Sequence, residues 1–348
     1  MGIVICEADL QRDKEALIQT LNQNRTRSTD EQRYRWRYLE NPHGKAKAWI
    51  AVDDHKNAIA GFTVVHPRLM QVYDEQMLCW NCGDFSINKH YRSLGVALKL
   101  RSAATQCVNQ GQVPFLYAHP NDHMKVVHLK VGHKVLGQMV RYARVLRFDR
   151  YLPASVAGSW FAEGLTWVYH HGLVSWKNVL RCGRPYYRRI FHIFPADAAF
   201  DELQDQVRGA LKVYGVRSGE YLRWRFGTNP LLPVSTLLLY KNGDPVGYAF
   251  FSKTGSVMNV HDLFCLPEEA VSSALIAHLT EVGLEQKMQA ISVVLFESNP
   301  FIHALKRHGY VLRPETSSVI VHTSSAMPWG PALLDKTSWF MTVGDRDV

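Results

Sequence analysis

The chain has 348 residues, of which 47% are hydrophobic and 20% are charged, and its formal net charge is +9. This much apolar content excludes an intrinsically disordered chain. No run reaches the ~18 consecutive apolar residues of a membrane span, and residues 1–7 lack the basic stretch and apolar segment of a secretory signal. The six scattered cysteines do not resemble a disulfide framework. These features predict a cytoplasmic protein, and the length predicts two domains.

The charge excess alone does not identify a partner. A positive net charge suits a nucleic acid, an anionic membrane surface or an acidic small ligand. The densest basic stretches are residues 25–37 and 181–189, but both contain aromatic residues and neither is a continuous Lys/Arg block. We interpret most of the excess as ordinary surface charge.

One segment of the sequence occurs twice in the same register. Residues 34–42 read Tyr-Arg-Trp-Arg-Tyr-Leu-Glu-Asn-Pro, and residues 222–230 read Leu-Arg-Trp-Arg-Phe-Gly-Thr-Asn-Pro. Further landmarks follow in the same order, since Asn121 and Asn299 each follow an apolar run. An ordered series of matches predicts two copies of one fold.

The predicted elements follow the same order in each copy. In the first copy, a helix precedes the Trp-containing helix, which stops at Asn-Pro because the residue before proline leaves the helical region. Two strands are joined by the polar turn at residues 53–57, and a third strand follows. An amphipathic helix then starts near Gly95, and strand 113–118 leads to a helix that ends at Gly132. The second copy has its turn at residues 241–244, and the mixture predicts the α/β (α+β) class.

Two segments have no partner in the repeat. Residues 151–195 are rich in Trp, Tyr, His and Gly and are interpreted as a connecting segment. Residues 339–343 predict a final strand in a tail that follows the second copy. The expected domains are therefore residues 1–150 and residues 196–348, separated by the connecting segment.

The most informative stretch lies at residues 84–100. A strand ends there, a short loop carries Arg92 and Gly95, and an amphipathic helix begins. The first turn of a helix offers unpaired N–H groups and the positive end of the dipole, which favour a bound phosphate. Gly95 permits close approach to the backbone, and Arg92 adds positive charge. The loop is not a Walker loop, which needs Gly-x-x-x-x-Gly-Lys-Ser/Thr.

Arg92-x-x-Gly95-x-Ala97 resembles the Gln/Arg-x-x-Gly-x-Gly/Ala signature of the GNAT N-acyltransferase superfamily. The preceding strand, the following helix, and the later residues Asn121 and 128–133 are in the order that the superfamily shows. The resemblance implies two tandem GNAT folds, each a mixed, mostly antiparallel sheet flanked by helices. The first copy would be the acyl-coenzyme A-binding catalytic domain.

The resemblance implies a coenzyme A site that runs from this strand to the helix. The backbone of residues 94–97 would hold the pyrophosphate, and the strand at residues 85–87 would pair with the pantetheine arm and polarise the thioester carbonyl. The expected co-substrate is acetyl-CoA or another acyl-CoA, and no metal is expected. The expected coenzyme-binding residues are Phe85, Ile87, Arg92, Leu94, Gly95, Val96, Ala97 and Asn121.

The second copy departs from the signature in the matching loop, residues 266–274. It has no Arg at the first position and no Gly at the fourth, and it carries Glu268 and Glu269. Two carboxylates would repel a pyrophosphate, although they also suit the first turn of a helix. We expect a degenerate second domain that does not bind coenzyme A.

Acyl transfer to an amine needs a base, a donor to the tetrahedral oxyanion, and a proton for the departing thiolate. Asp84 is the candidate base because it lies on the strand of the predicted acyl site. A structural carboxylate is the alternative, which the matching Asp262 favours. His128 is the candidate acid because it occupies a position that usually holds Tyr in the family, and imidazole can donate a proton near neutral pH. A packed histidine is the alternative.

Two groups of metal-ligand residue types are weighed against ordinary packing. Cys79 and Cys82 form a Cys-x-x-Cys pair, but residues three apart on a strand face opposite sides and no second pair exists. Closely spaced histidines lack a nearby carboxylate arranged as a third ligand: His119, His123, His128 and His133.

The favoured function is an acyl-CoA-dependent N-acyltransferase, most simply an acetyltransferase, acting on a small-molecule amine or amino sugar. It would transfer groups other than aminoacyl groups. The second copy would shape the acceptor site or form a homodimer contact. The alternatives are a Fem-like transferase that uses aminoacyl-tRNA and a GNAT-fold binding module without catalysis. The intact pyrophosphate loop argues for coenzyme A and against nucleic acid.

Overall fold

The structure, a computed structural model, describes residues 2–25, 28–56, 58–92, 94–147, 185–324 and 327–347. The strands of the first half are β1 (Ile3–Glu7), β2 (Lys47–Asp53), β3 (Ala58–Val72), β4 (Glu75–Ile87), β5 (Phe115–Ala118) and β6 (Lys134–Val145). Its helices are α1 (Lys14–Asn22), α2 (Glu31–Tyr38), the 3-10 turn η1 (Lys89–Tyr91), α3 (Leu94–Asn109) and α4 (Asp122–Lys130).

The second half follows the same plan with a longer tail. Its strands are β7 (Tyr186–Phe191), β8 (Val213–Gly215), β9 (Ser235–Lys241), β10 (Asp244–Thr254), β11 (Val257–Cys265), β12 (Ala290–Phe296), β13 (Val311–Thr323) and β14 (Trp339–Phe340). Its helices are α7 (Ala198–Val207), α8 (Gly219–Leu222), the π-helical turn η4 (Arg223–Gly227), α9 (Glu269–Glu285), α10 (Phe301–Arg307), α11 (Gly330–Leu334) and the 3-10 turns η5 (Lys336–Ser338) and η6 (Val343–Asp345).

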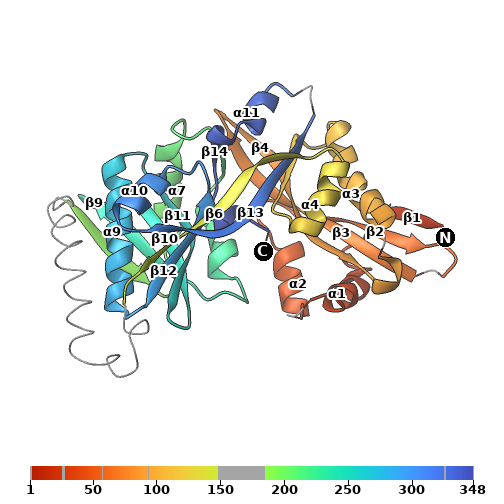
Figure 1. Ribbon diagram of the computed structural model, residues 1–348, viewed down its shortest axis with the longest axis horizontal. Helices are drawn as coiled ribbons and strands as arrows, with labels where there is room; N and C mark the ends of the chain where they lie inside the picture. Colours follow the sequence, from red (N-terminus) through yellow and green to blue (C-terminus); the bar gives the residue numbers. More distant parts are fainter. Residues whose placement is uncertain are drawn as a thin grey trace.

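The described strands join into one mixed sheet in the order β1-β2-β3-β4-β5-β13-β6-β12-β11-β10-β9-β7, with β8 and β14 attached beside β3. Most neighbours are antiparallel; the parallel pairs among the described strands are β4 with β5, β11 with β12, and β8 with β14. Helices flank the sheet in both halves (Figure 1). This architecture confirms the predicted α/β class.

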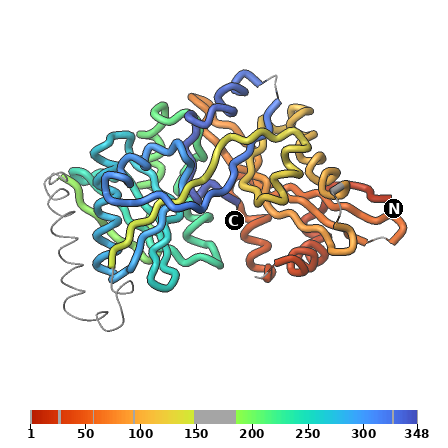
Figure 2. Tube along the Cα trace, viewed as in Figure 1, coloured from red at the N-terminus to blue at the C-terminus, as the bar shows by residue number. Residues whose placement is uncertain are grey.

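The two halves exchange their last strands. β6 leaves the first half to pair with β12, from Ala290↔Val145 to Phe296↔Met139. β13 leaves the second half to pair with β5, from Ile320↔Ala118 to Thr323↔Phe115. The two exchanged strands also pair with each other, and they run side by side through the middle of the molecule (Figure 2). The sheet is therefore continuous across both halves.

The order of elements from β9 to α10 is the same as the order from β2 to α4. This shared order supports the predicted repeat. β7 lies within the predicted connecting segment, and it pairs with β9 at the edge of the sheet. The remainder of that segment up to residue 184 lies outside the described residues. The predicted final strand at residues 339–343 is shorter, because only Trp339 and Phe340 form β14, while Thr342 makes an isolated bridge.

Alternating residues of β2 show how the helices cover the first-half sheet. Ala48 and Ile50 pack with α1 and α2, whereas Trp49 and Ala51 pack with α3. Successive side chains of a strand point to opposite faces, so α3 lies on the other face from α1 and α2. The apolar stripe of α3 supplies buried Leu100 and other residues to this core, as its periodicity predicts.

The repeated Trp residues meet at the junction of the two halves. The indole N–H of Trp36 donates to the Trp224 carbonyl at 2.9 Å, and the indole N–H of Trp224 donates to the Trp36 carbonyl at 2.9 Å. The two rings stack with centroids 5.1 Å apart. The repeated segment therefore contacts its own counterpart.

A buried carboxylate also joins the halves. Asp345 accepts a hydrogen bond from Arg68 of β3 at 3.1 Å and another from Arg217, which follows β8, at 2.6 Å. Each of these side chains is at most 4% exposed, so the charges are paired away from water.

Among the described residues, none of the helices combines the length and hydropathy that a membrane crossing requires.

Candidate functional site

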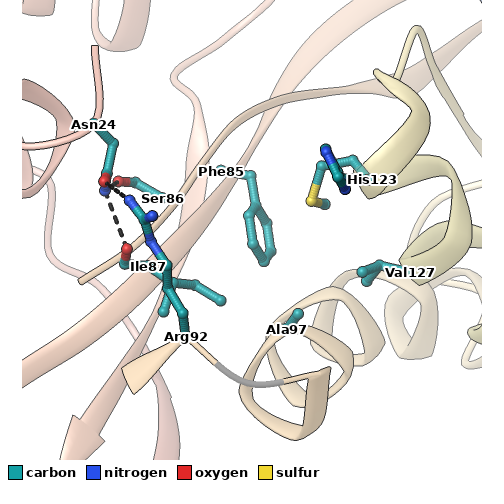
Figure 3. A pocket seen from close by; sticks show the side chains of 9 residues that line it. Asn24, Phe85, Ser86, Ile87, Arg92, Ala97, His123 and Val127 are labelled. Atoms are coloured by element: carbon teal, nitrogen blue, oxygen red, sulfur yellow. Dashed lines mark hydrogen bonds between the residues drawn. The ribbon is translucent and has the colours of Figure 1, made fainter. Parts of the chain in front are cut away.

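A pocket of about 590 Å³ opens between the end of β4, the start of α3 and the first turns of α4. Figure 3 shows the Phe85 ring directed into this space from β4, with Ala97 of α3 below it and Val127 of α4 opposite. The lining residues are Asn24, Phe85, Ser86, Ile87, Arg92, Ala97, His123, Met124 and Val127. Four of the residues predicted to bind the coenzyme, Phe85, Ile87, Arg92 and Ala97, therefore share one pocket.

The divergence of β4 and β5 creates this opening. The parallel pairing begins at Trp80↔Leu116 and ends at Cys82↔Ala118. Beyond Cys82, β4 continues to Ile87 and remains paired with β3 on its other edge. Its backbone groups on the β5 side then have no strand partner among the described residues. An extended chain with amide groups can pair with such an edge.

The first turn of α3 faces the same pocket. Of this turn only Ala97 lines the pocket; Gly95 is exposed outside its lining, and Val96 is buried against the core. The side chain of Leu94 lies outside the described residues. The N–H groups of a first helical turn and the dipole of a 16-residue helix favour an anion at this position. The predicted pyrophosphate position is thus adjacent to the open edge of β4.

Arg92 contacts Asn24 across the mouth of the pocket. Its guanidinium donates to Asn24 Oδ1, and the Asn24 amide donates to Ser86 Oγ at 2.6 Å and to the Ile87 carbonyl at 3.1 Å. These three contacts appear together in Figure 3. A second pocket of about 400 Å³ shares Asn24 and Arg92 and adds Lys89 and His90. Arg92 therefore lines both cavities, and the second one also contains the charge of Lys89.

Asp84 lies on the other side of β4, facing α2. The phenol of Tyr38 donates to its Oδ2 at 2.6 Å, Arg37 pairs with its Oδ1 at 3.2 Å, and Arg25 also donates to Oδ1. The side chain is 1% exposed. It does not line the described pocket, and its oxygens already accept two hydrogen bonds and make one further ion pair. These contacts suit the alternative of a structural carboxylate, while the proposed base role stays a prediction.

His128 is buried in the last turn of α4 and contacts other ligand-type side chains. Its Nδ1 lies 3.2 Å from His133 Nε2. Burial lowers the pKa of His128 well below its ordinary value, and the charge of Arg101 acts in the same direction. The ring is therefore neutral at pH 7. It lies next to the lining residue Val127 without lining the pocket itself.

Asn121 has a local structural role. Its side chain caps α4 by accepting a hydrogen bond from the Met124 backbone N–H at 2.9 Å. The predicted coenzyme contact of Asn121 stays a prediction. Its capping of α4 fixes where this helix begins, and so fixes the position of His123 and Val127 beside the pocket.

No protein-family model matches the sequence, and no curated protein is a significant match. Among solved structures, a GCN5-related N-acetyltransferase from Anabaena variabilis has a TM-score of 0.66 at 14% identity, covering 92% of this chain and 73% of that one. One from Kribbella flavida has a TM-score of 0.60 at 12% identity, covering 92% and 71%. N-myristoyltransferase from Saccharomyces cerevisiae, with bound myristoyl-CoA, has a TM-score of 0.56 at 11% identity, covering 94% and 80%.

The chain has the GNAT fold. In the second half, the loop predicted to match residues 92–97 carries two acidic residues, and each of them contacts basic side chains. Glu269 of α9 pairs with Arg307 of α10, and His303 lies 3.4 Å from the same carboxylate. Glu268 lies 3.5 Å from Lys241. An ion pair between α9 and α10 thus spans the place where α3 and α4 leave the first-half pocket open.

Sequence reasoning missed several residues that line the pocket of this GNAT fold. His123, Met124 and Val127 all lie on α4, and the spacing of three and four places them on one helical face. This spacing is present in the sequence and could have predicted that the three residues share one face. Asn24 follows α1 without any pattern, and only the folded chain brings it to Ile87, 63 residues later.

Proposed function

We propose that this protein is an acyl-CoA-dependent N-acyltransferase that moves an acyl group from coenzyme A to an amine by direct attack. The observation that carries the proposal is the pocket in which the open edge of β4 meets the first turn of α3. Solved structures with this fold include N-acetyltransferases and an N-myristoyltransferase with bound myristoyl-CoA, which supports a coenzyme A thioester as donor.

In this proposal, different groups in and beside the pocket would contact different parts of the donor. The N–H groups around Gly95 and the charge of Arg92 would hold the pyrophosphate. The free edge of β4 between Gly83 and Ile87 would pair with the pantetheine amides, and an N–H of that edge would stabilise the tetrahedral oxyanion. Phe85, whose ring points into the pocket, would contact the apolar part of the thioester arm.

The acceptor in this proposal is a small molecule with a primary amine, such as an amino sugar. The amine must lose a proton, and the leaving thiolate must gain one. Asp84 and His128 are retained as the proposed base and acid, although neither lines the described pocket. The second half is proposed to have lost coenzyme binding, because Glu269 would repel a pyrophosphate.

The proposal is tested by coenzyme binding. Isothermal titration of acetyl-CoA against the full chain should give saturable binding. Gly95→Glu places a carboxylate at the pyrophosphate position and should weaken the affinity by at least about tenfold, equal to roughly 1.4 kcal/mol. Gln106→Glu is the matched control, since it adds the same charge at an exposed position of the same helix. It should bind like the parent chain.

Other outcomes would contradict the proposal. If acetyl-CoA and longer acyl-CoA thioesters all fail to bind the parent chain, the coenzyme role is wrong. Binding of tRNA with a steep salt dependence, in place of coenzyme A, would favour the Fem-like transferase. Binding of coenzyme A without turnover against a panel of amines would favour a non-catalytic module.

A further inference from the structure

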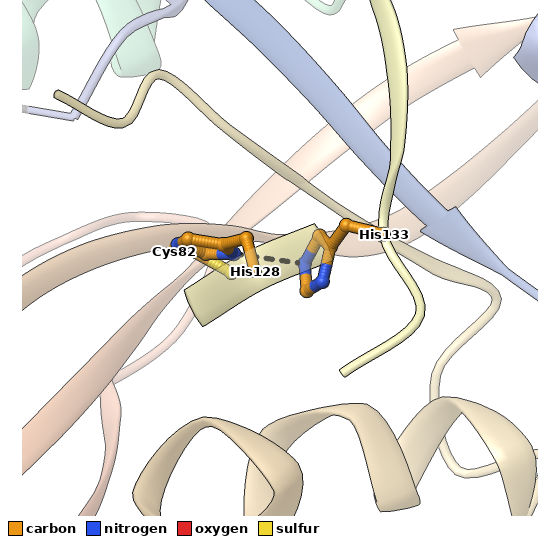
Figure 4. Close-up of side chains that lie close together, drawn as sticks. All are labelled: Cys82, His128 and His133. Carbon is orange, nitrogen blue, oxygen red and sulfur yellow. Dashed lines mark hydrogen bonds between the residues drawn. The ribbon is translucent and has the colours of Figure 1, made fainter. Parts of the chain in front are cut away.

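Three ligand-type side chains converge beside the pocket without lining it. Cys82 lies on β4, and His128 lies in the last turn of α4. His133 lies between Gly132 and the first residue of β6. Their donor atoms all lie within 4.8 Å of one another. Each residue is at most 5% exposed. Figure 4 shows the His128 and His133 rings next to each other, with Cys82 beside His128.

The turn after α4 holds the two histidines together. The His133 backbone N–H donates to the His128 carbonyl at 3.1 Å, and Gly132 between them has φ +95°. Only glycine adopts that conformation readily, so the turn is fixed by the sequence. The rings meet almost at right angles with centroids 4.4 Å apart. The cluster is therefore built into the fold and does not depend on mobile side chains.

The second half shows that the fold does not need metal-ligand side chains at these positions. The counterparts of Cys82, His128 and His133 are Val260, Leu305 and Tyr310, when the halves are matched through their aspartates and glycines. All three counterparts belong to the hydrophobic core of the second half. One half fills these positions with apolar and aromatic side chains, whereas the other places a metal-ligand type at every one of them.

A buried cation lies near the three side chains. Arg101 is 1% exposed, and its charge acts on Cys82, His128 and His133 alike. A metal ion would have to bind against that positive charge, and the Cys82 thiol would release its proton on binding.

We propose that Cys82, His128 and His133 bind one zinc ion through Sγ and two ring nitrogens. Thiolate and imidazole are the ligands that Zn²⁺ prefers, and the 3.2 Å separation of the two ring nitrogens fits neighbouring ligands of one tetrahedral ion. Three protein ligands leave one position for water. Because Arg101 brings a positive charge nearby, we expect weaker binding than at a site of several thiolates.

The test uses the full chain with zinc and cobalt as probes. After dialysis against Zn²⁺ and removal of free metal, elemental analysis should find about one ion per chain. Replacement by Co²⁺ should give an absorption band for thiolate-to-cobalt charge transfer. Cys82→Ser should lose that band, and His133→Phe should weaken Co²⁺ binding by at least about tenfold.

Cys79→Ser is the matched control. Cys79 belongs to the same Cys-x-x-Cys pair and is equally buried, but it packs in a different core cluster. Its loss should leave the cobalt band unchanged. Failure of the parent chain to bind Zn²⁺ or Co²⁺ more tightly than Cys82→Ser would overturn the proposal, as would equal loss of the band in Cys79→Ser.

The metal assignment does not rest on acyl transfer and gives His128 a second role to distinguish. If His128 is a metal ligand, the His128→Phe variant must lose metal, as the Cys82→Ser and His133→Phe variants do. If His128→Phe lowers turnover while its cobalt spectrum stays that of the parent chain, His128 is a proton donor and the proposed site is wrong. Circular dichroism of each variant checks that the chain remains folded.

Discussion

Asp84 shows how strongly its neighbours determine what a single carboxylate can do. Arg37, Tyr38 and Arg25 all direct donors at it within a nearly dry environment. Asp262 in the second half is held in a similar way, by Arg217 and by the phenol of Tyr248 at 2.9 Å. The same chemistry in both halves is expected if the carboxylate stabilises the fold.

We predict that Asp84→Asn destabilises the protein by about 3–5 kcal/mol, because it leaves Arg37 buried beside a neutral partner. Urea denaturation measures this loss. Asp74→Asn, at an exposed position in the turn between β3 and β4, is the control and should change the unfolding free energy by less than about 0.5 kcal/mol. A stable Asp84→Asn variant with lost turnover would instead establish Asp84 as the base.

At the scale of elements, the junction between the halves depends on two short helical segments. α2 contains residues 34–38 of the first copy of the repeated sequence, and η4 contains residues 223–227 of the second copy. Each segment brings one Trp to the junction, where each indole satisfies the backbone carbonyl of the other. A buried carbonyl without a donor is costly, so the two elements depend on each other.

We predict that Trp224→Phe lowers the unfolding free energy by about 1–3 kcal/mol, because it leaves the buried Trp36 carbonyl without its indole donor. Trp36→Phe should cost less, because the Trp224 carbonyl also accepts a hydrogen bond from the Thr228 hydroxyl at 3.2 Å. The double variant should show a coupling of at least about 0.5 kcal/mol, since the residues are in contact. Urea denaturation of the parent chain, the two single variants and the double variant gives the four unfolding free energies of this double-mutant cycle. The pair Trp36 and Trp49, which pack in different core clusters, should be additive. Additivity for Trp36 and Trp224 would contradict the reciprocal contact.

Elements with a local signal were predictable from the sequence, whereas contacts over long separations were not. The stripe of α3 and the Arg92-to-Ala97 loop are encoded within a few residues; the structure buries the stripe in the core and places Arg92 and Ala97 at the pocket. The Asn24 contacts and the convergence of Cys82 with His128 and His133 join separate elements. Strand alternation correctly placed Cys79 and Cys82 on opposite faces of the strand. It could not reveal that the turn after α4 brings two histidines to Cys82.

At the scale of the whole molecule, the exchanged strands decide how the halves depend on each other. β6 and β13 each look like the last strand of their own copy, and a pattern of alternating residues does not say which sheet a strand joins. Within the sheet, β13 lies between β5 and β6, and β6 lies between β13 and β12. Each half thus completes the sheet of the other, and β13 pairs with β5, the strand next to the pocket-lining β4.

We predict that neither half folds alone and that the two associate when they are made as separate chains. A cut within residues 148–184 would leave β6 on one fragment and β13 on the other. Co-expressed fragments 1–147 and 185–348 should copurify and elute together, because an unpaired β5 edge and an isolated β6 would otherwise remain exposed. A second fragment that stops at residue 310 lacks β13 and should fail to associate. If fragment 1–147 is soluble, monomeric and natively folded by itself, the exchange does not couple the halves.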